Sequence, residues 1–339
     1  MRGSHLAACA ALPAGGAALP VLAQEDRIAQ LEARVAALEQ RPKLSFGVGG
    51  IDLTIYGYIK ADLIHDLDSD LGTTFFGIGS LTPGPGTASN FRGHAFQSRI
   101  GVRANLDEAT AVLEGDFFGS GGGQLRLRHA HVDVGPFRFG QNWTNFMPLE
   151  SYPSTLDFHG PAGIPFTRVV QARYTWKGPN GLGFSASVED PAGNSSDPAL
   201  TAAVFHQGER FFAKLAAVGT RVNGPAGEVD GWGVNLSGNA QLWEGGTINA
   251  SFTTGEAISS YMVFGGADIF AGQAVESTGV TIGPSQEVNT WTFGAVHGFR
   301  DNDIGGPHRH RAAPDAAPDG QLPDPGQHDG RDRVHHRRA

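Results

Sequence analysis

The chain has 339 residues, among them 49 glycines and 21 phenylalanines, and only 17% of its residues are charged. This composition predicts many short strands rather than helices. The formal net charge of −9 argues against a nucleic-acid partner, which needs a basic face. No run of about 18 apolar residues follows the N-terminus, so a membrane-spanning form of this chain has to be a β-barrel.

Residues 1–23 have the features of a signal peptide. Arg2 lies in a short basic start, a middle rich in Ala and Leu follows, and small residues precede a cut after Ala23. The alternative is a disordered Ala-rich tail. Cys9 is the only cysteine. A chain cut after Ala23 therefore has no thiol for a disulfide, a nucleophile or a metal site.

Residues 24–45 predict a short coiled coil and a linker. Apolar residues at positions 28, 31, 35 and 38 repeat at spacings of three and four, as in a coiled-coil seam, and Pro42 ends the pattern. Two heptads are too short to be stable alone, so further contacts have to hold the chains together. The alternative is an amphipathic helix that lies on its own domain.

Between residues 51 and 299 the pattern has a period of two, which is typical of β-strands. Turns rich in glycine, proline and asparagine separate the segments. About twelve strands are predicted, at residues 53–63, 96–106, 110–118, 124–134, 136–143, 168–177, 183–189, 201–206, 211–220, 231–242, 246–254 and 290–299.

The polar faces and the strand ends favour a membrane barrel over a soluble sandwich or propeller, which alternation alone also fits. The polar faces carry several arginines, and aromatic residues such as Tyr174, Trp176 and Trp232 lie near strand ends. Rings at the ends of strands that are apolar outside and polar inside form the girdles of outer-membrane barrels. We therefore predict an all-β fold, a transmembrane antiparallel β-barrel, over residues 46–299.

The order of these segments resembles the trimeric DcaP-like porins of Gram-negative outer membranes. The resemblance is carried by IYGYIKADLIHD at 55–66, SRIGVRAN at 98–105, LRLRHAHVDVG at 125–135, RFGQNWTNFM at 138–147 and TLDFHGPAG at 155–163. It extends over residues 25–299 and implies a barrel of sixteen strands in outer-membrane lipid. It also implies a homotrimer whose coiled coil projects into the periplasm, and a channel that prefers small anionic solutes such as dicarboxylates.

Basic residues on the polar faces agree with that preference. Alternation places a set of cations in the lumen: Lys60, Arg99, Arg103, Arg126, Arg138 and Arg173. The acids placed there are fewer, mainly Asp62, Glu114, Asp116 and Glu189. Rings of cations in a pore favour anions, and a guanidinium binds a carboxylate through two hydrogen bonds. The alternative is that the arginines pair with Glu114 and Asp116 on a neighbouring strand and only stiffen the wall.

Residues 140–163 combine aromatic residues with prolines between two predicted strands. This position is that of an inward-folded constriction loop, so we predict that its rings pack against the inner wall and narrow the pore. The polar residues of this segment are candidates for the narrowest point of the pore: Asn142, Asn145, Glu150, Asp157 and His159. Two of these residues, Glu150 and Asp157, are acids and weaken the predicted anion preference.

Catalytic and cofactor chemistry is not predicted. His129 and His131 share a strand face with Asp133, but two histidines without further ligands are more often ordinary lumen residues than a metal site. Ser98, His94 and His159 are available to a hydrolase, yet no hydrolase or phosphate-binding motif occurs in the sequence. We predict no enzyme, no cofactor and no metal.

Residues 300–339 lack alternation and aromatic residues and are rich in Arg, Asp, His and Pro. Such a segment cannot bury enough apolar surface to offset its ordering entropy. We interpret it as out-of-frame sequence, with a natural disordered tail as the alternative. The predicted function is a passive porin. A non-conducting structural or surface barrel, or a truncated porin without function, is the alternative.

Overall fold

The computed structural model describes residues 44–303 except 49, 68–69, 74–88 and 156–159. The predicted signal peptide, coiled coil and C-terminal tail lie outside the described residues, as do Asp157 and His159. No helix in the described ranges is long and apolar enough to cross a membrane.

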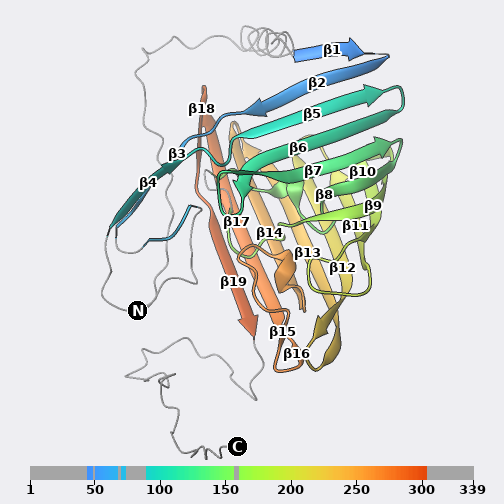
Figure 1. The fold of residues 1–339 in the computed structure, drawn as a ribbon, viewed down its shortest axis with the longest axis vertical. Coiled ribbons are helices and arrows are strands. Elements are labelled where there is room, and N and C mark those ends of the chain that lie inside the picture. Colours follow the sequence, from blue (N-terminus) through green and yellow to red (C-terminus); the bar gives the residue numbers. More distant parts are fainter. Residues whose placement is uncertain (1–43, 49, 68–69, 74–88, 156–159, 304–339) are drawn as a thin grey trace, which may run out of the picture. The chain divides into compact units, whose positions relative to one another are not determined.

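One large antiparallel sheet dominates the described residues, and its fifteen strands follow one another almost in chain order (Figure 1). Its strands are β1 (Leu44–Val48), β2 (Ile51–Tyr58), β5 (Arg99–Leu106), β6 (Ala109–Gly119), β7 (Gln124–Val134), β8 (Phe137–Trp143), β9 (Arg168–Lys177), β10 (Leu182–Glu189), β11 (Ala199–Gln207), β12 (Phe211–Gly224), β13 (Gly227–Trp243), β14 (Gly246–Glu256), β17 (Glu276–Val288), β18 (Trp291–Gly294) and β19 (His297–Asp303).

Two small hairpins lie outside this sheet. One pairs β3 (Asp62–Asp66) with β4 (Asn90–His94), and the other pairs β15 (Ile269–Phe270) with β16 (Gln273–Ala274). Three short 3-10 helices complete the described elements: η2 (Leu149–Ser151), η3 (Pro179–Gly181) and η4 (Ser259–Tyr261).

The two faces of the sheet differ in chemistry, as the alternation predicts. In β12, Lys214, Ala216 and Thr220 are buried, while Phe211 and Leu215 between them are about half exposed, at 48% and 52%. The other long strands repeat this arrangement with buried Ser, Thr and Asn on one face and exposed Leu, Val, Phe and Trp on the other. This apolar-out and polar-in order is that of a membrane barrel wall.

Connections at one end of the strands are short, whereas those at the other end include long ones. Short turns join β5 to β6, β9 to β10 and β17 to β18, and they place Asp107, Asn180 and Asn289 at positive φ. Asp and Asn tolerate this conformation better than other side-chain-bearing residues. The long connections comprise residues 59–98, 144–167, 190–198 and 257–275.

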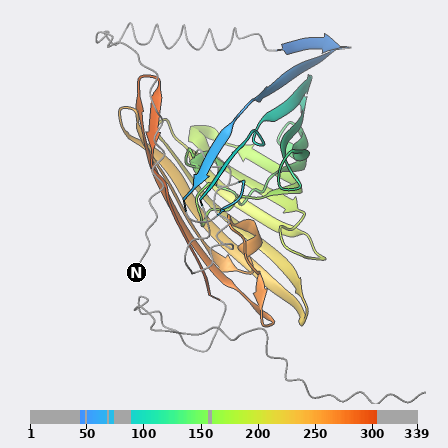
Figure 2. The same cartoon turned by 60° about the vertical axis from the view of Figure 1, so that its left-hand side comes forward.

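The series of strands begins at β1 and ends with β18 and β19 (Figure 2). β17 pairs with both of the last two: Ser285–Val288 with β18, and Glu276–Ile282 with β19. Within the described residues β1 does not pair with β18 or β19, so this sheet is not closed.

The predicted strands are largely confirmed, but two of them differ in extent, and β1, β4, β15, β16 and β17 were not predicted. The strand predicted at 53–63 ends at Tyr58, and its continuation belongs to the β3–β4 hairpin. The strand predicted at 290–299 is two strands, of which β19 extends to Asp303. β17 was not predicted, because Gly279 and Gly283 occupy two of its buried positions and Pro284 interrupts its exposed face, which holds Val280 and Ile282.

Candidate functional site

Residues 144–167 leave β8 and return to β9 across the polar face of the sheet. The neck of this segment is closed by a hydrogen bond from Thr144 N to Thr167 O of 3.1 Å. Phe146 is fully buried in a cluster with Ala203, Val218 and Ile258. Its ring meets that of Tyr261 edge to face at 6.0 Å between centroids. We call residues 144–167 the inner loop.

Polar contacts fix the first half of the inner loop to strands β10–β13. Glu189 accepts hydrogen bonds from Thr144 Oγ1 and from Asn145 N, the latter at 2.8 Å. Lys214 Nζ donates to Met147 O at 2.9 Å. Near the next turn, Asn239 Nδ2 donates to the carbonyl oxygen of Glu150 at 2.6 Å.

The second half of the inner loop packs against η4, β17 and β19. Val263 N donates to Ile164 O at 2.9 Å, and Phe166 N donates to Tyr261 O at 2.8 Å. Gly163 has a φ of +82°, and a Cβ atom there would collide with Phe299 O. The loop therefore contacts strands on both sides of the polar face.

A buried carboxyl fixes the segment that receives this second half. Asp268 accepts a hydrogen bond from Ser260 N in η4 at 2.9 Å. Burial raises the pKa of the Asp268 carboxyl above its ordinary value. Burial also raises the pKa of Tyr261 to about 12. Both shifts extend the neutral form of the side chain to higher pH.

Paired arginines line β5–β7. Asp116 is fully buried and accepts two hydrogen bonds from Arg126, at 3.0 and 2.7 Å, and one from Arg128 at 3.0 Å. Glu114 forms salt bridges with Arg128 at 2.9 Å and Arg99 at 3.3 Å. We call these five residues the arginine–carboxylate ladder.

Strand register explains the ladder. Asp116 lies opposite both Arg99 on β5 and Arg126 on β7. A bulge between Glu114 and Gly115 shifts the register of β7, and Arg128 then faces the same acids at only 4% exposure. The bulge thus turns Arg128 inward, toward these acids.

Two further predicted cations also have acidic partners. Arg138 binds Asp133 through two hydrogen bonds, at 2.7 and 2.8 Å. Lys60 forms a salt bridge with Asp62 and donates to Gln97 Oε1 at 2.6 Å. The alternative given by the sequence, in which arginines pair with Glu114 and Asp116, thus describes Arg99 and Arg126, whereas Lys60 and Arg138 pair with other acids.

Three arginines near the inner loop and the ladder, Arg103, Arg168 and Arg173, form no salt bridge with a carboxylate of the described residues. The Arg103 guanidinium lies 5.8 Å from the centroid of the Tyr56 ring. Arg168 stacks over Trp143 at 4.9 Å, and Arg173 donates to Trp143 O at 2.6 Å. Buried N–H groups at Arg168 Nη1 and Arg173 Nε have no protein partner.

Arg168 was not among the predicted site residues. It is the first residue of β9. Val169 and Gln171 lie on the buried face of this strand, so alternation predicts that Arg168 faces outward. The packing of its guanidinium on Trp143 brings it to this site instead. Trp143 was noted in the sequence only as one ring of the loop region.

The predicted loop residues fall into different places. Asn142 belongs to β8 and contacts His131 Nδ1 at 3.2 Å. Asn145 is buried at 1% exposure and hydrogen-bonds Ser185. The Glu150 side chain is exposed. Asp157 and His159 lie outside the described residues.

The alternative chemical candidates do not assemble into a site. His131 Nε2 lies 3.9 Å from Asp133, and the His129 ring packs on Trp143. The described residues contain no group of three or more side chains arranged to hold a metal. Ser98 Oγ contacts the main chain of Lys60, while the ring of His94 contacts Thr73 O at 2.5 Å.

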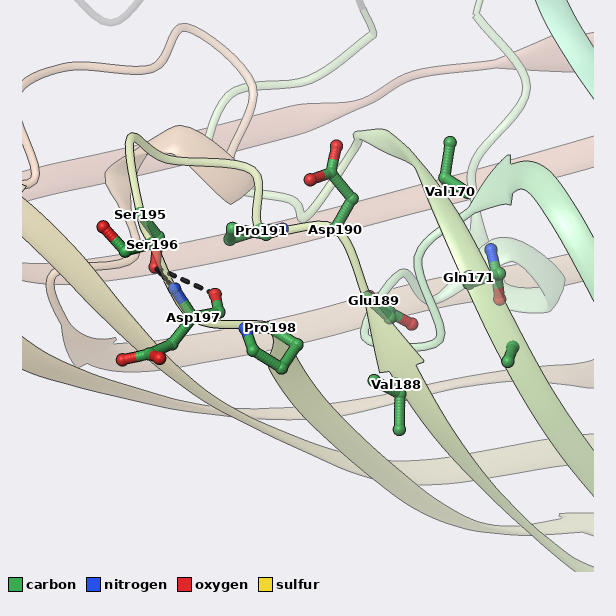
Figure 3. A pocket seen from close by; sticks show the side chains of 11 residues that line it. Val170, Gln171, Val188, Glu189, Asp190, Pro191, Ser195, Ser196, Asp197 and Pro198 are labelled. Atoms are coloured by element: carbon green, nitrogen blue, oxygen red, sulfur yellow. Dashed lines mark hydrogen bonds between the residues drawn. The ribbon is translucent and has the colours of Figure 1, made fainter.

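A separate cavity of about 460 Å³ lies between the ends of β9 and β10 and residues 190–198 (Figure 3). Its charged lining residues are acidic, namely Glu189, Asp190 and Asp197. The hydroxyl of Ser195 accepts a hydrogen bond from the main-chain N–H of Asp197 at 3.1 Å. Arg103, Arg168 and Arg173 are not among the residues that line this cavity.

Comparisons with known proteins agree with this architecture. The family model of the DcaP outer membrane protein matches residues 45–178. The fold is similar to the crystal structure of the outer membrane channel DcaP of Acinetobacter baumannii, with a TM-score of 0.67 and 23% identity over 77% of this chain and 82% of that one.

More distant similarities are to porins. OmpF of Salmonella typhi is matched at a TM-score of 0.46 and 11% identity over 75% of this chain and 81% of its own. OmpT of Vibrio cholerae is matched at 0.41 and 13% over 76% and 89%. No curated protein matches the sequence. The family match confirms, over residues 45–178, the resemblance to DcaP-like porins predicted from the sequence, and the structural similarity shows a porin-like fold.

Proposed function

We propose that this protein is a passive diffusion channel that prefers small anionic solutes such as dicarboxylates. The exposed apolar face of the sheet suits lipid, and the buried polar face suits a water-filled lumen. The inner loop crosses that polar face and is the constriction of the proposed channel.

The proposal includes a closed barrel of sixteen strands and a homotrimer with a periplasmic coiled coil. An open sheet edge in lipid leaves backbone groups unsatisfied, so β1 and the β18–β19 end have to be paired in the membrane. The similarity to the DcaP channel supports a closed barrel. The coiled coil is the proposed contact that links three chains in the periplasm.

The observation that carries the anion preference is the set of guanidinium groups without a carboxylate. Arg168 and Arg173 have N–H groups that are shielded by protein yet lack a partner. A guanidinium group that no protein carboxylate neutralises can bind a solute carboxylate through charge-assisted hydrogen bonds. Arg103 adds a third cation that is not neutralised by a salt bridge.

The ladder has a different role in this proposal. Each of its arginines already binds Glu114 or Asp116, so these residues stiffen the wall and contribute only to the general field. Of the six predicted anion-binding residues, Arg103 and Arg173 remain, and Arg168 joins them.

Reversal potentials in a planar bilayer with a chloride salt gradient test the proposal. A potential of the sign that indicates anion permeability supports it. A potential that indicates cation permeability contradicts the proposed selectivity.

The second candidate function is a non-conducting barrel whose lumen the inner loop fills. The near-complete burial of Phe146 and Met147 favours it, because these residues leave little space beside strands β10–β13. Swelling of liposomes in solutions of small solutes separates the two functions. A folded protein that supports no swelling favours the plugged barrel over the channel.

A further inference from the structure

Glu189, at the end of β10, is a buried acid with an unusual set of partners. Its exposed fraction is 2%, and among the described residues it forms no salt bridge. Two of its donors lie on the wall: Ser187 Oγ at 2.8 Å and Thr201 Oγ1 at 3.0 Å. The other two, Thr144 Oγ1 and Asn145 N, lie in the inner loop.

Glu189 Oε1 accepts three of these hydrogen bonds, from Asn145, Ser187 and Thr201, and Oε2 accepts the one from Thr144. An ionised carboxylate offers about four lone-pair sites. Glu189 thus accepts hydrogen bonds from two wall hydroxyls and two loop groups. Arg173 does not donate to Glu189 but to Trp143 O. The acid joins loop to wall and leaves the neighbouring arginine without a carboxylate.

The loop residues that Glu189 holds are next to the residue that contacts both unpaired arginines. Trp143 directly precedes Thr144; its ring lies under Arg168 and its carbonyl oxygen accepts from Arg173. Gln171 Nε2 donates to the same oxygen at 2.9 Å. A shift of Thr144 and Asn145 away from the wall would therefore also shift Trp143.

We propose that Glu189 is a positioning residue that pins the inner loop to the wall, and that it thereby sets both the width of the channel and the placement of Arg168 and Arg173. This inference rests on the proposed function for its effect on permeation. The pinning itself rests only on the contacts of Glu189 and is measurable without conduction.

The direction in which a Glu189 variant changes the anion selectivity distinguishes a positioning role from a purely electrostatic one. Removing a negative charge from the lumen makes a pore more anion-selective if charge alone counts. Releasing the loop has the opposite effect, because the pore widens and the arginines lose their fixed geometry. A variant that loses both the charge and the anchor therefore becomes less anion-selective if Glu189 is a positioning residue.

Two substitutions separate these contributions. Glu189→Ala removes the charge and all four hydrogen bonds. Glu189→Gln removes the charge but keeps a carbonyl oxygen for Asn145, Ser187 and Thr201. We expect E189A to show a larger conductance and a weaker anion preference than the native protein, and E189Q to restore most of the native behaviour.

Glu150→Gln is the matched charge control. Its side chain is exposed on the same loop, and only its carbonyl oxygen is used in a contact. We expect E150Q to raise the anion preference, opposite in sign to E189A. Equal increases in anion preference for E189A, E189Q and E150Q would show that Glu189 acts by charge alone and would overturn the inference.

Limited proteolysis with chymotrypsin measures the pinning directly, since Phe146 is fully buried in the native protein. Cleavage tracks the population of the open loop when opening is fast, so loss of charge-assisted hydrogen bonds should accelerate cleavage after Phe146 about tenfold or more in E189A. Unchanged cleavage would overturn the inference. If the native protein does not conduct, the proposed function fails, and this comparison still decides the pinning.

Thr144→Val covers the case in which E189A does not fold. It removes one loop donor and leaves the carboxylate with its wall partners. We expect faster cleavage after Phe146 in T144V, to a smaller degree than in E189A. Native cleavage rates in T144V would contradict the pinning.

Discussion

The two walls that flank Trp143 treat their arginines differently. On β5–β7, Arg99, Arg126 and Arg128 are matched with Glu114 and Asp116 across adjacent strands. On β9, Arg168 and Arg173 contact the ring and carbonyl oxygen of Trp143 and no carboxylate. The same residue type is thus a structural brace on one wall and an available cation on the other.

The inner loop accounts for much of this difference. Near the start of the inner loop, the buried carboxylate of Glu189 accepts hydrogen bonds from loop and wall donors. Trp143 is held there against the arginines of β9. Among the described residues, the carboxylates of the ladder form no hydrogen bond with the inner loop and pair with arginines instead. The number of arginines in a wall therefore does not determine how much positive charge a solute meets there. The pairing of those arginines with carboxylates matters as well.

Deletion of residues 145–163 should reduce the difference between the two walls the most. The deletion removes the constriction and frees Glu189 to pair with Arg173, so both walls become braced. We expect a larger conductance and a blunted anion preference in single-channel recordings. A channel with unchanged conductance would show that the loop lies outside the solute path.

Asp116→Asn breaks the paired wall. It leaves the guanidinium groups of Arg126 and Arg128 without their shared carboxylate at a position with 0% exposure. Breaking a buried ion pair by removing one partner costs about 3–5 kcal/mol. We expect a loss of this size in the free energy of unfolding, measured by denaturant titration of the refolded protein.

Asp230→Asn is the control for this substitution. Asp230 pairs with Arg221 at 3.0 Å, but its side chain is 84% exposed. Exposed pairs contribute about 0–1 kcal/mol. Equal losses in D116N and D230N would contradict the structural role of the ladder.

The sequence predicts the walls better than it predicts the pairing within them. Period-two alternation locates most strands and their polar faces, because burial on one side repeats with the pleat. It does not reveal the bulge at Glu114 that turns Arg128 inward, since a bulge changes register without changing composition. β17 escaped prediction for a related reason: glycines take the place of its buried side chains.

The candidate site was predictable only in outline. Acids and arginines of the lumen follow from alternation, but which arginine meets which acid depends on cross-strand register. Arg168 joins the site through its contact with Trp143. In the sequence, the whole inner loop separates these two residues. No local pattern encodes such a pair.

Gly163→Ala sharpens the comparison at the far attachment of the loop. The backbone there has a φ of +82°, and a methyl group would collide with Phe299 O and lie 2.9 Å from the Gly279 Cα. Overpacking of this kind costs about 1–3 kcal/mol. We expect a lower unfolding temperature and faster chymotrypsin cleavage within the loop.

Gly121→Ala is the matched control. Its φ is +84°, and no atom lies within 4 Å of the added methyl group. Both substitutions carry the same backbone strain, so their difference isolates the contact with β17 and β19. If G121A destabilises the protein as much as G163A, the second attachment contributes nothing.

The central claim is that unpaired arginines, and not net charge, bind the solute. Arg168→Gln and Arg126→Gln each remove one positive charge from the same face, but Arg126 is bound to Asp116 and Arg168 has no carboxylate partner. Block of chloride current by a dicarboxylate gives the dissociation constant for each variant. We predict that R168Q weakens dicarboxylate binding about tenfold, the equivalent of one charge-assisted hydrogen bond, and that R126Q changes it far less. Equal weakening in the two variants would contradict the account.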